Sequence, residues 1–494
     1  MRSESADSGE RLTNEMNVTD ILGSPEEEYS NFVYVVAAIA ALNGLLFGFD
    51  IGIISGALLY IKQSFALSTF LQEVVVSGVL VGAMLGAAVG GGLADRFGRR
   101  RLTIAGAAVF FAGSIGMGLS PNVTWLVGFR FVVGIAVGVA SIVGPLHISE
   151  TAPPSIRGSL GFLQQLAITL GILLAYLVSY AFAPTFAGIP GWRWMLAFGA
   201  VPAAVLGIGM YFLPESPRWL VEKGRDDEAR DVLSRIRADA DIEEEMDEIN
   251  EVSEIESEGN LADLLEPWLR PALLVGIGLA VFQQISGINT IIYYAPTILK
   301  NIGFGNVASI VGTVGVGIVN VLLTVVAILL VDRIGRRPLL LVGVGGMTVM
   351  LGILGLGFYL PSLSGIVGYV TLGSMILYVA FYAVSLGPVF WLMISEIYPL
   401  RIRGTAEGVA SVFNWGANLL VALTFLSLIQ RIGEALSFWI LGVCCLAAFV
   451  FIYFRVPETK GRSLEEIEST LRESTFVGSD GDSGTTEYEP DVRE

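Results

Sequence analysis

The sequence predicts an all-α membrane protein with twelve transmembrane helices in two pseudo-symmetric six-helix bundles. Of its 494 residues, 53% are hydrophobic and 15% are charged, and the mean hydropathy is +0.69. A soluble chain has about 25% charged residues. Runs of the roughly 20 apolar residues that cross a bilayer core occur twelve times, and short motifs recur in the same order in both halves. Such recurrence indicates an internal repeat.

The apolar runs fall into two groups of six, separated by a long polar segment. In chain order they are 32–61, 72–93, 102–120, 123–147, 159–182 and 192–213, then 271–299, 307–331, 338–360, 367–395, 404–429 and 434–455. Ser120, Pro121 and Asn122 supply a tight turn between the third and fourth runs. We expect bundles at 32–213 and 271–456, a linker with short amphipathic helices at 214–270, and tails at 1–31 and 457–494.

Most of the charge lies outside the apolar runs. Residues 1–31, 214–270 and 457–494 have net charges of −6, −12 and −7, which leaves the apolar body at +8. Alternate loops between the runs hold most of the loop arginines. The positive-inside rule places those loops, the linker and both acidic tails in the cytoplasm. We therefore expect a multi-pass protein of the cell membrane with both termini cytoplasmic.

Three motifs are repeated at a nearly constant offset. Asp-Arg-Phe-Gly-Arg-Arg at 95–100 recurs as Asp-Arg-Ile-Gly-Arg-Arg at 332–337. Ile-Ser-Glu and Ile-Arg-Gly at 148–150 and 156–158 recur at 394–396 and 402–404, and Pro-Glu at 214–215 recurs at 457–458. Homologous halves of this kind place a substrate site between them, near the middle of the membrane, and transport by rocking against each other.

Together with other motifs, these repeats resemble the sugar porter family of the major facilitator superfamily. The others are Pro-Leu-His-Ile-Ser-Glu at 145–150, Pro-Glu-Ser-Pro-Arg-Trp at 214–219, Gln-Gln-Ile-Ser-Gly-Ile-Asn at 283–289, Gly-Pro-Val-Phe-Trp at 387–391 and Pro-Glu-Thr-Lys-Gly at 457–461. The resemblance implies the major facilitator fold and import of a monosaccharide by proton symport through alternating access. The partners would be the sugar, the proton and the lipid bilayer, with no cofactor and no nucleic acid. We expect a functional monomer.

Asp50 is a charged residue inside the otherwise apolar first run. A charge at the centre of a span costs about 2.5–3.5 kcal/mol on insertion scales and indicates a functional site. The resemblance implies that Asp50 carries the proton, since proton–sugar symporters have an Asp at the similar position. Arg130, in the fourth run, is its expected partner. A purely structural ion pair between the two helices is the alternative. The second carboxylate that some proton-coupled members have in the sixth helix is missing here.

Amides and aromatic rings in the apolar runs are the candidates for sugar binding, because a sugar needs neutral hydrogen-bonding groups and a flat ring for its C–H face. The resemblance places eight of them at sugar-contacting positions: Gln165, Gln283, Gln284, Asn289, Asn320, Trp391, Asn414 and Trp415. On a regular helix Gln283 and Asn289 point about 120° apart. They converge only if the helix breaks, and Ser286 and Gly287 supply a place for that. Hydrogen bonding between helices is the alternative role for such amides.

Charged residues at the inner ends of the helices form a third group of candidates. They are Asp95, Arg99, Arg100, Glu150 and Arg157 in the first half, and Asp332, Arg336, Arg337, Glu396 and Arg403 in the second. The resemblance implies a latch that holds the outward-facing state and breaks on inward opening. Arginines also fix orientation, but orientation needs no carboxylate, so the repeated Asp and Glu favour the latch.

Two other functions stay open, an uncoupled facilitator (uniporter) of a sugar or polyol and a non-transporting membrane sugar sensor. An enzyme is not expected, because the sequence has no Walker loop, nucleophile elbow or metal-binding constellation. Cys444 and Cys445 are adjacent and cannot bridge a loop. The single histidine, His147, argues against histidine-based catalysis. It is expected to make a hydrogen bond at the inner end of the fourth helix.

Overall fold

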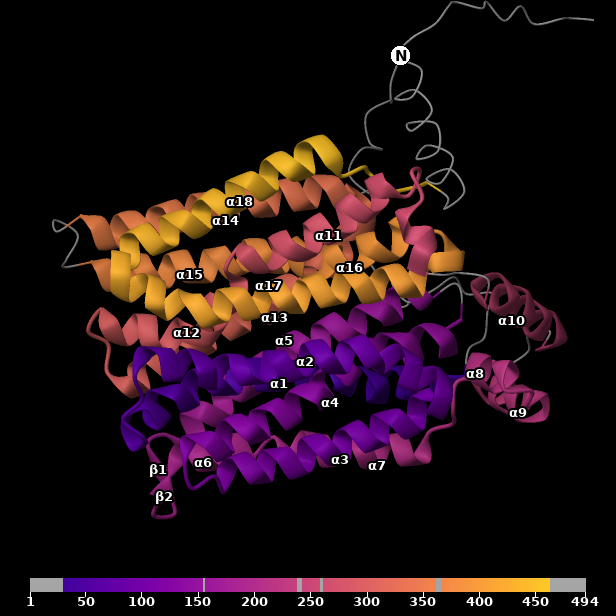
Figure 1. Cartoon of the computed structure of the whole chain (residues 1–494), viewed down its shortest axis with the longest axis horizontal. Coiled ribbons are helices and arrows are strands. Elements are labelled where there is room, and N and C mark those ends of the chain that lie inside the picture. The colour runs from indigo at the N-terminus through magenta and orange to yellow at the C-terminus, as the bar shows by residue number, and fades with distance from the viewer. Residues whose placement is uncertain (1–29, 154–155, 238–241, 258–260, 361–365, 463–494) are drawn as a thin grey trace, which may run out of the picture.

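A computed structural model describes residues 30–153, 156–237, 242–257, 261–360 and 366–462 as an assembly of long helices (Figure 1). Within these residues, twelve helical spans are long and apolar enough to cross a membrane. The predicted number of transmembrane helices is therefore confirmed. Nearly all of both predicted tails lies outside the described residues.

The first half of the chain forms six spans from seven helices. They are α1 (Asn31–Ser64), α2 (Thr69–Phe97), α3 (Arg99–Gly118), α4 (Val123–Thr151), α5 (Arg157–Phe182), α6 (Gly191–Ala197) and α7 (Ala200–Phe212). The last two are consecutive parts of one span. A small antiparallel hairpin, β1 (Thr185–Phe186) with β2 (Ile189–Pro190), joins α5 to α6.

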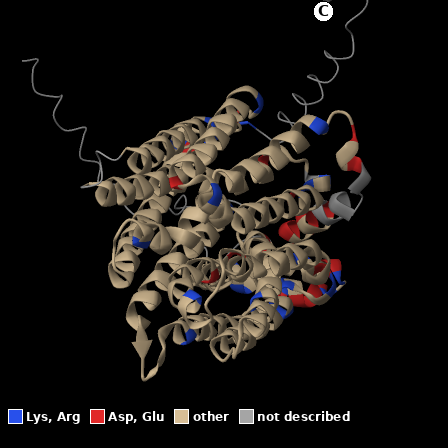
Figure 2. Cartoon of the chain, turned by 60° about the vertical axis from the view of Figure 1, so that its left-hand side comes forward, with Lys and Arg blue, Asp and Glu red and all other residues tan. Residues whose placement is uncertain are grey.

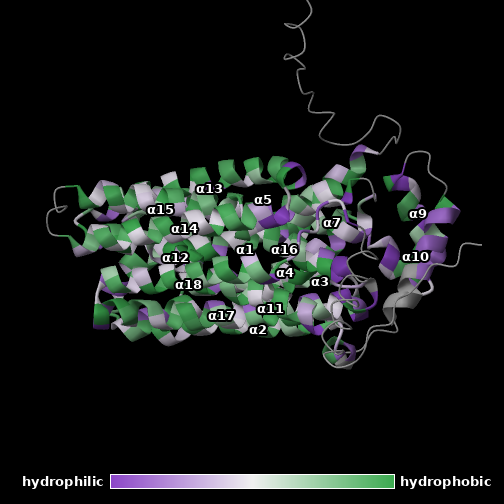
Figure 3. Cartoon of the chain, turned by 90° about the horizontal axis from the view of Figure 1, so that it is seen from above, coloured by the Kyte–Doolittle hydropathy of each residue, from purple (hydrophilic) through white to green (hydrophobic). Residues whose placement is uncertain are grey.

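The linker forms short helices beyond one end of the bundles: α8 (Pro217–Glu222), α9 (Asp226–Ile236), α10 (Ile242–Ser257) and the 3-10 helix η2 (Leu261–Leu265). Charged residues gather there (Figure 2), and hydrophobic residues dominate the long helices (Figure 3). We call the end of the molecule with α8 to α10 the linker end and the opposite end, with β1 and β2, the hairpin end (Figure 1). The short linker helices were predicted.

The second half repeats the six spans. Its helices are α11 (Arg270–Ile285), α12 (Ile288–Asn301), α13 (Asn306–Ile334), α14 (Arg336–Tyr359), α15 (Val367–Ala383), α16 (Leu386–Ile397), the 3-10 helix η4 (Leu400–Ile402), α17 (Arg403–Ile432) and α18 (Glu434–Arg455). The run 367–395, predicted as one helix, is two helices that are separated at Val384 and Ser385. The halves face each other through α2 against α17, α5 against α13 and α1 against α12.

The seventh span breaks where the sequence predicted an irregularity. The helix α11 ends at Ile285, and Gly287 has a φ of +92° before α12 begins at Ile288. Left-handed backbone of this kind favours glycine, because it has no Cβ. The break turns Asn289 toward Gln284, so the two amides that a straight helix would separate share one hydrogen bond.

Gly287→Ala is expected to lower the stability of the protein and to weaken any binding at these amides. A Cβ at this position would lie 2.6 Å from Cδ1 of Leu441, in addition to the left-handed strain. The strain alone costs about 1–2 kcal/mol. Thermal unfolding in detergent measures the loss. Gly315→Ala, in α13, is the control, because no atom lies within 4 Å of its added Cβ; equal destabilisation by the two substitutions would contradict the argument.

Candidate functional site

Four amide side chains from α11, α12 and α17 are joined in one hydrogen-bonded cluster, which we call the amide cluster: Gln283, Gln284, Asn289 and Asn414. The Gln284 Oε1 accepts from Asn289 Nδ2 at 2.6 Å, and Gln284 Nε2 donates to Asn414 Oδ1 at 3.0 Å. Asn414 Nδ2 donates to Gln283 Oε1 at 2.7 Å. All four side chains are buried. The break in the seventh span therefore brings together amides that are distant on a regular helix.

The cluster is anchored to the backbone of its own half. Gln283 Nε2 donates to the carbonyl of Leu386 at 2.8 Å, at the start of α16, and Asn414 Nδ2 donates to the carbonyl of Ala280 at 3.0 Å. These bonds hold two of the four amides in fixed orientations. Within the described part of the chain, the side chains of Gln284 and Asn289 make hydrogen bonds only to other amides of the cluster, so they are the members most free to exchange these bonds for a ligand.

No described hydrogen bond joins the other predicted sugar residues to this cluster. Trp415 is buried and contacts Phe47 of α1, with ring centroids 5.1 Å apart. Gln165 lies on α5, and its Nε2 would be 3.5 Å from a Cβ on Gly387 of the other half. Trp391 packs on Phe390, with ring centroids 4.7 Å apart, and Asn320 is buried in α13. Trp415 and Gln165 thus lie where the two halves meet.

Asp50 and Arg130 are both buried in the first half and face each other. Arg130 Nη1 lies 3.6 Å from Asp50 Oδ1, and the two side chains are 0% and 3% exposed. Neither of these atoms has a hydrogen-bond partner among the described residues, so the contact is ionic rather than hydrogen-bonded. Arg130 Nη2 donates to the carbonyl of Val76 in α2 at 3.1 Å. The predicted pairing is therefore present, and Arg130 also holds α2.

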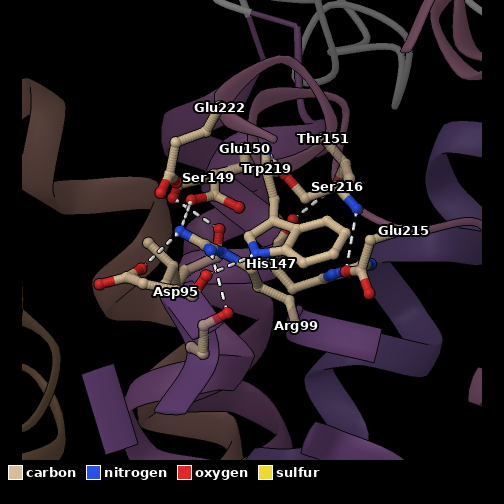
Figure 4. Close-up of polar contacts among 12 residues, drawn as sticks. Asp95, Arg99, His147, Ser149, Glu150, Thr151, Glu215, Ser216, Trp219 and Glu222 are labelled. Carbon is tan, nitrogen blue, oxygen red and sulfur yellow. Dashed lines mark hydrogen bonds and ion pairs between the residues drawn. The ribbon is translucent and has the colours of Figure 1, made fainter. Parts of the chain in front are cut away.

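A buried ion pair organises the linker end of the first half (Figure 4). Arg99 Nη2 lies 2.8 Å from Glu150 Oε1 and 3.1 Å from Asp95 Oδ1. The backbone N–H of Arg100 donates to Glu215 Oε1 at 2.9 Å, while its side chain donates to backbone carbonyls of α7. Glu215 can approach the start of α3 because Gly98, just before that helix, has a φ of +92° and no Cβ that would clash with the carboxylate.

The second half repeats this arrangement. Arg336 lies 2.8 Å from Glu396 and 3.0 Å from Asp332. The backbone N–H groups of Arg336 and Arg337 donate to the two oxygens of Glu458, both at 3.0 Å. Glu215 and Glu458, the acids of the repeated Pro-Glu motif, therefore belong to these networks. The sequence interpretation noted that repeat but did not assign the two acids to the networks.

The sequence prediction named the members of each network without assigning pairs among them. Glu150 pairs with Arg99 and Glu396 with Arg336. The predicted hydrogen bond of His147 is wrong, because neither ring nitrogen of this buried side chain has a partner within the described part of the chain.

Removal of one charge is expected to destabilise the first network more than the second. Arg99 and Glu150 are 6% and 2% exposed, whereas Arg336 and Glu396 are 12% and 24% exposed. An uncompensated buried charge costs about 3–5 kcal/mol, and exposure to water reduces that cost. Thermal unfolding of Arg99→Gln and Arg336→Gln in detergent should show the larger drop for Arg99→Gln. Equal drops would contradict this ranking.

An apolar recess of about 660 Å³ lies at the surface of the first half, between α3, the end of α5, α6 and α7. Only aromatic and aliphatic side chains line it, so it lacks the hydrogen-bonding groups that a sugar requires. In the described residues, no group of three or more His, Cys, Asp or Glu could hold a metal ion. The amide cluster is therefore the stronger candidate for a binding site.

Two repeated six-span halves that meet beside a buried neutral polar cluster define a membrane carrier of the major facilitator fold. The family model described as "Sugar (and other) transporter" matches residues 36–471. The chain belongs to this family.

Several similar proteins are named as transporters or symporters. The D-xylose transporter of Levilactobacillus brevis is 43% identical, with 90% of this chain and 96% of that protein covered. The galactose-proton symporter of Escherichia coli strain K12 is 41% identical, with 89% and 94% covered. Among solved structures, the partially occluded inward-open xylose transporter XylE from E. coli is 34% identical, with a TM-score of 0.78 and 88% and 100% of the two chains covered.

Proposed function

We propose that this protein imports a monosaccharide by proton symport, with alternating access between the two halves. The observation that carries the proposal is the amide cluster of Gln283, Gln284, Asn289 and Asn414 in the membrane-spanning part of the second half. Relatives named as a D-xylose transporter and a galactose-proton symporter support a monosaccharide and a proton as the substrates. The site residues come from one chain, so we propose that the monomer is the functional unit.

Sugar binding would exchange hydrogen bonds between amides for hydrogen bonds to hydroxyl groups. A neutral amide is both donor and acceptor, as a hydroxyl group is, so the exchange leaves no buried polar group unpaired. Trp415, Trp391, Gln165 and Asn320 would complete the site from α17, α16, α5 and α13. Gln165 belongs to the first half, and a sugar held between it and the amide cluster would draw the halves together.

Proton coupling would act through Asp50 and Arg130. With Asp50 ionised, the pair fixes Arg130, which also holds the carbonyl of Val76. Protonation removes the negative charge and loosens Arg130, so its hold on α2 can change. Because α2 packs on α17 of the other half, a change in α2 would be transmitted to the interface between the halves.

The networks at the linker end would restrain inward opening. We propose, as the positive-inside rule indicates, that the linker end is cytoplasmic. We also propose that the halves comprise residues 32–213 and 271–456, with 214–270 as the cytoplasmic linker between them. Arg99 with Glu150 and Arg336 with Glu396 would then hold the inner ends of the helices together within each half and be disturbed on inward opening.

Uptake of radiolabelled monosaccharides into proteoliposomes, with and without an imposed pH gradient, tests this function. Accumulation above the external concentration only when the gradient is present supports proton symport. Uptake that stops at equilibration with any gradient supports an uncoupled facilitator, and specific sugar binding without flux supports a sensor.

A further inference from the structure

Glu73 is a buried acid that the residues discussed so far leave unused. It lies in the second turn of α2, near the hairpin end, and its exposed fraction is 0%. Its Oε1 accepts a hydrogen bond from the backbone N–H of Ser427 at 2.6 Å, and its Oε2 accepts one from Ser427 Oγ at 2.6 Å. Ser427 belongs to α17 in the other half. One carboxylate thus binds the two halves to each other.

The chemistry of this contact is suited to reversible opening. Glu73 has no ion-pair partner among the described residues. Its burial is compensated by two hydrogen-bond donors, and both belong to Ser427 on the opposing helix. A charged acceptor makes stronger hydrogen bonds than a neutral one. When the halves separate, water can replace both donors at once, and no uncompensated charge stays buried. A fixed structural charge would instead be paired within its own half, as Arg99 and Glu150 are.

A second contact closes the same end of the molecule. The hydroxyl of Tyr176, in α5, donates to the carbonyl of Ile292 in α12 at 3.3 Å. Tyr176 and Leu173 also press on Gly317 in α13, where an added Cβ would lie 2.9 Å and 3.3 Å from their side chains. These two cross-interface contacts involve different helices from those of Glu73. The hairpin end is therefore held shut on two sides.

The helix of Glu73 is also the one that Arg130 holds. Val76, whose carbonyl accepts from Arg130, lies one turn further along α2 than Glu73. Tyr294 of α12 lies close enough to both Glu73 and Arg130 to interact electrostatically with each of them. A change in the ion pair of Asp50 and Arg130 thus acts on α2 one turn away from the contact that joins the halves.

We propose that Glu73 is the positioning residue of the gate at the hairpin end. Glu73 accepts the two hydrogen bonds from Ser427 while that end is closed, and these bonds break when the carrier opens outward. The gate rests on the alternating-access function proposed above, and it adds a carboxylate to the cycle besides Asp50.

The test measures opening at a site remote from Glu73. Cys444 and Cys445 are the only cysteines, so a Cys444→Ala/Cys445→Ala background with Leu173→Cys carries one reporter, in the α5–α13 contact. A membrane-impermeant maleimide is applied to intact cells. Glu73→Ala, which removes both hydrogen bonds, is expected to label more than about tenfold faster than its parent, because loss of a single hydrogen bond to a charged group already corresponds to about tenfold. Ser427→Ala, which keeps the backbone donor, should give a smaller increase.

Gln72→Ala is the matched control. Gln72 is buried beside Glu73, but its Nε2 donates to the carbonyl of Leu67 in its own half, so its truncation should leave the labelling rate unchanged. Equal rates in the parent, Glu73→Ala and Ser427→Ala would overturn the gate, and so would an equal increase in Gln72→Ala. Sugar uptake by the same reporter strain is measured separately. A parent that transports normally while Glu73→Ala leaves labelling unchanged rejects the gate and leaves the proposed function standing.

Discussion

Asp50→Asn is expected to abolish accumulation of sugar against a gradient while sparing exchange of sugar across the membrane. With one proton per sugar, a gradient of one pH unit can sustain an accumulation of about tenfold, because one pH unit corresponds to about 1.36 kcal/mol. An amide cannot carry the proton, so the accumulation ratio of the variant should fall to about one. Uptake into proteoliposomes with an imposed gradient measures the ratio, and counterflow of labelled sugar measures exchange.

The buried position of Asp50 requires controls for folding. Asp50→Asn leaves the charge of Arg130 buried and unpaired, which costs about 3–5 kcal/mol. The double variant Asp50→Asn/Arg130→Gln removes both charges and should recover the thermal stability in detergent without recovering accumulation. Asp50→Glu, which keeps a titratable group, should retain part of the coupling. If a stably folded Asp50→Asn variant still accumulates sugar, Asp50 is not the proton carrier, and its ion pair with Arg130 has a structural role.

The sequence predicted the fold well because hydropathy and repeated motifs report directly on membrane spans. It also located the break in the seventh span, since Ser286 and Gly287 interrupt an otherwise regular helix. The split of the tenth span at Val384 and Ser385 was not predicted, although Gly387 and Pro388 lie just after it, in the first turn of α16, where a proline is tolerated and a helix interior would not allow it. Tertiary packing, such as the hydrogen bond from Gln283 to the carbonyl of Leu386 just after the split, accompanies that irregular backbone.

Pairing between distant residues was the weakest part of the sequence interpretation. Repetition of acid and arginine showed that networks exist, but it could not decide that Glu150 pairs with Arg99 rather than with Arg157. The roles of Glu215 and Glu458 depend on the left-handed backbone of the two preceding motif glycines, Gly98 and Gly335. Glu73 sits at the polar edge of an apolar run, where an acid looks like a solvated residue. Only the approach of α17 reveals its burial.

Gln284→Leu is expected to have the largest effect among the amide variants. Gln284 is the hub of the amide cluster, because it accepts from Asn289 and donates to both Asn414 and Gln283. Leucine has a similar volume but leaves a donor on Asn289 and an acceptor on Asn414 buried and unpaired. In the complex, the two sugar hydroxyl groups that would bind the Gln284 amide are also left buried and unpaired. Each such group costs about 1–3 kcal/mol, so kcat/KM for sugar uptake should fall by about 10²–10³-fold. Initial rates of uptake over a range of sugar concentrations measure this loss.

Gln164→Leu separates this role from ordinary packing of amides between helices. Gln164 has the same side chain and nearly the same burial, 7% exposed against 6% for Gln284. Its amide packs between Gly44 of α1 and Gly144 of α4, within the first half and apart from the cluster. Its Oε1 has no hydrogen-bond partner in the described structure. An apolar replacement therefore removes an unpaired acceptor and does not leave a new one. Uptake by Gln164→Leu should stay within about threefold of the wild type, since no described group loses a hydrogen-bond partner in this variant. If Gln164→Leu lost as much kcat/KM as Gln284→Leu, buried amides of this protein would matter for packing alone, and the sugar site would have to be sought elsewhere.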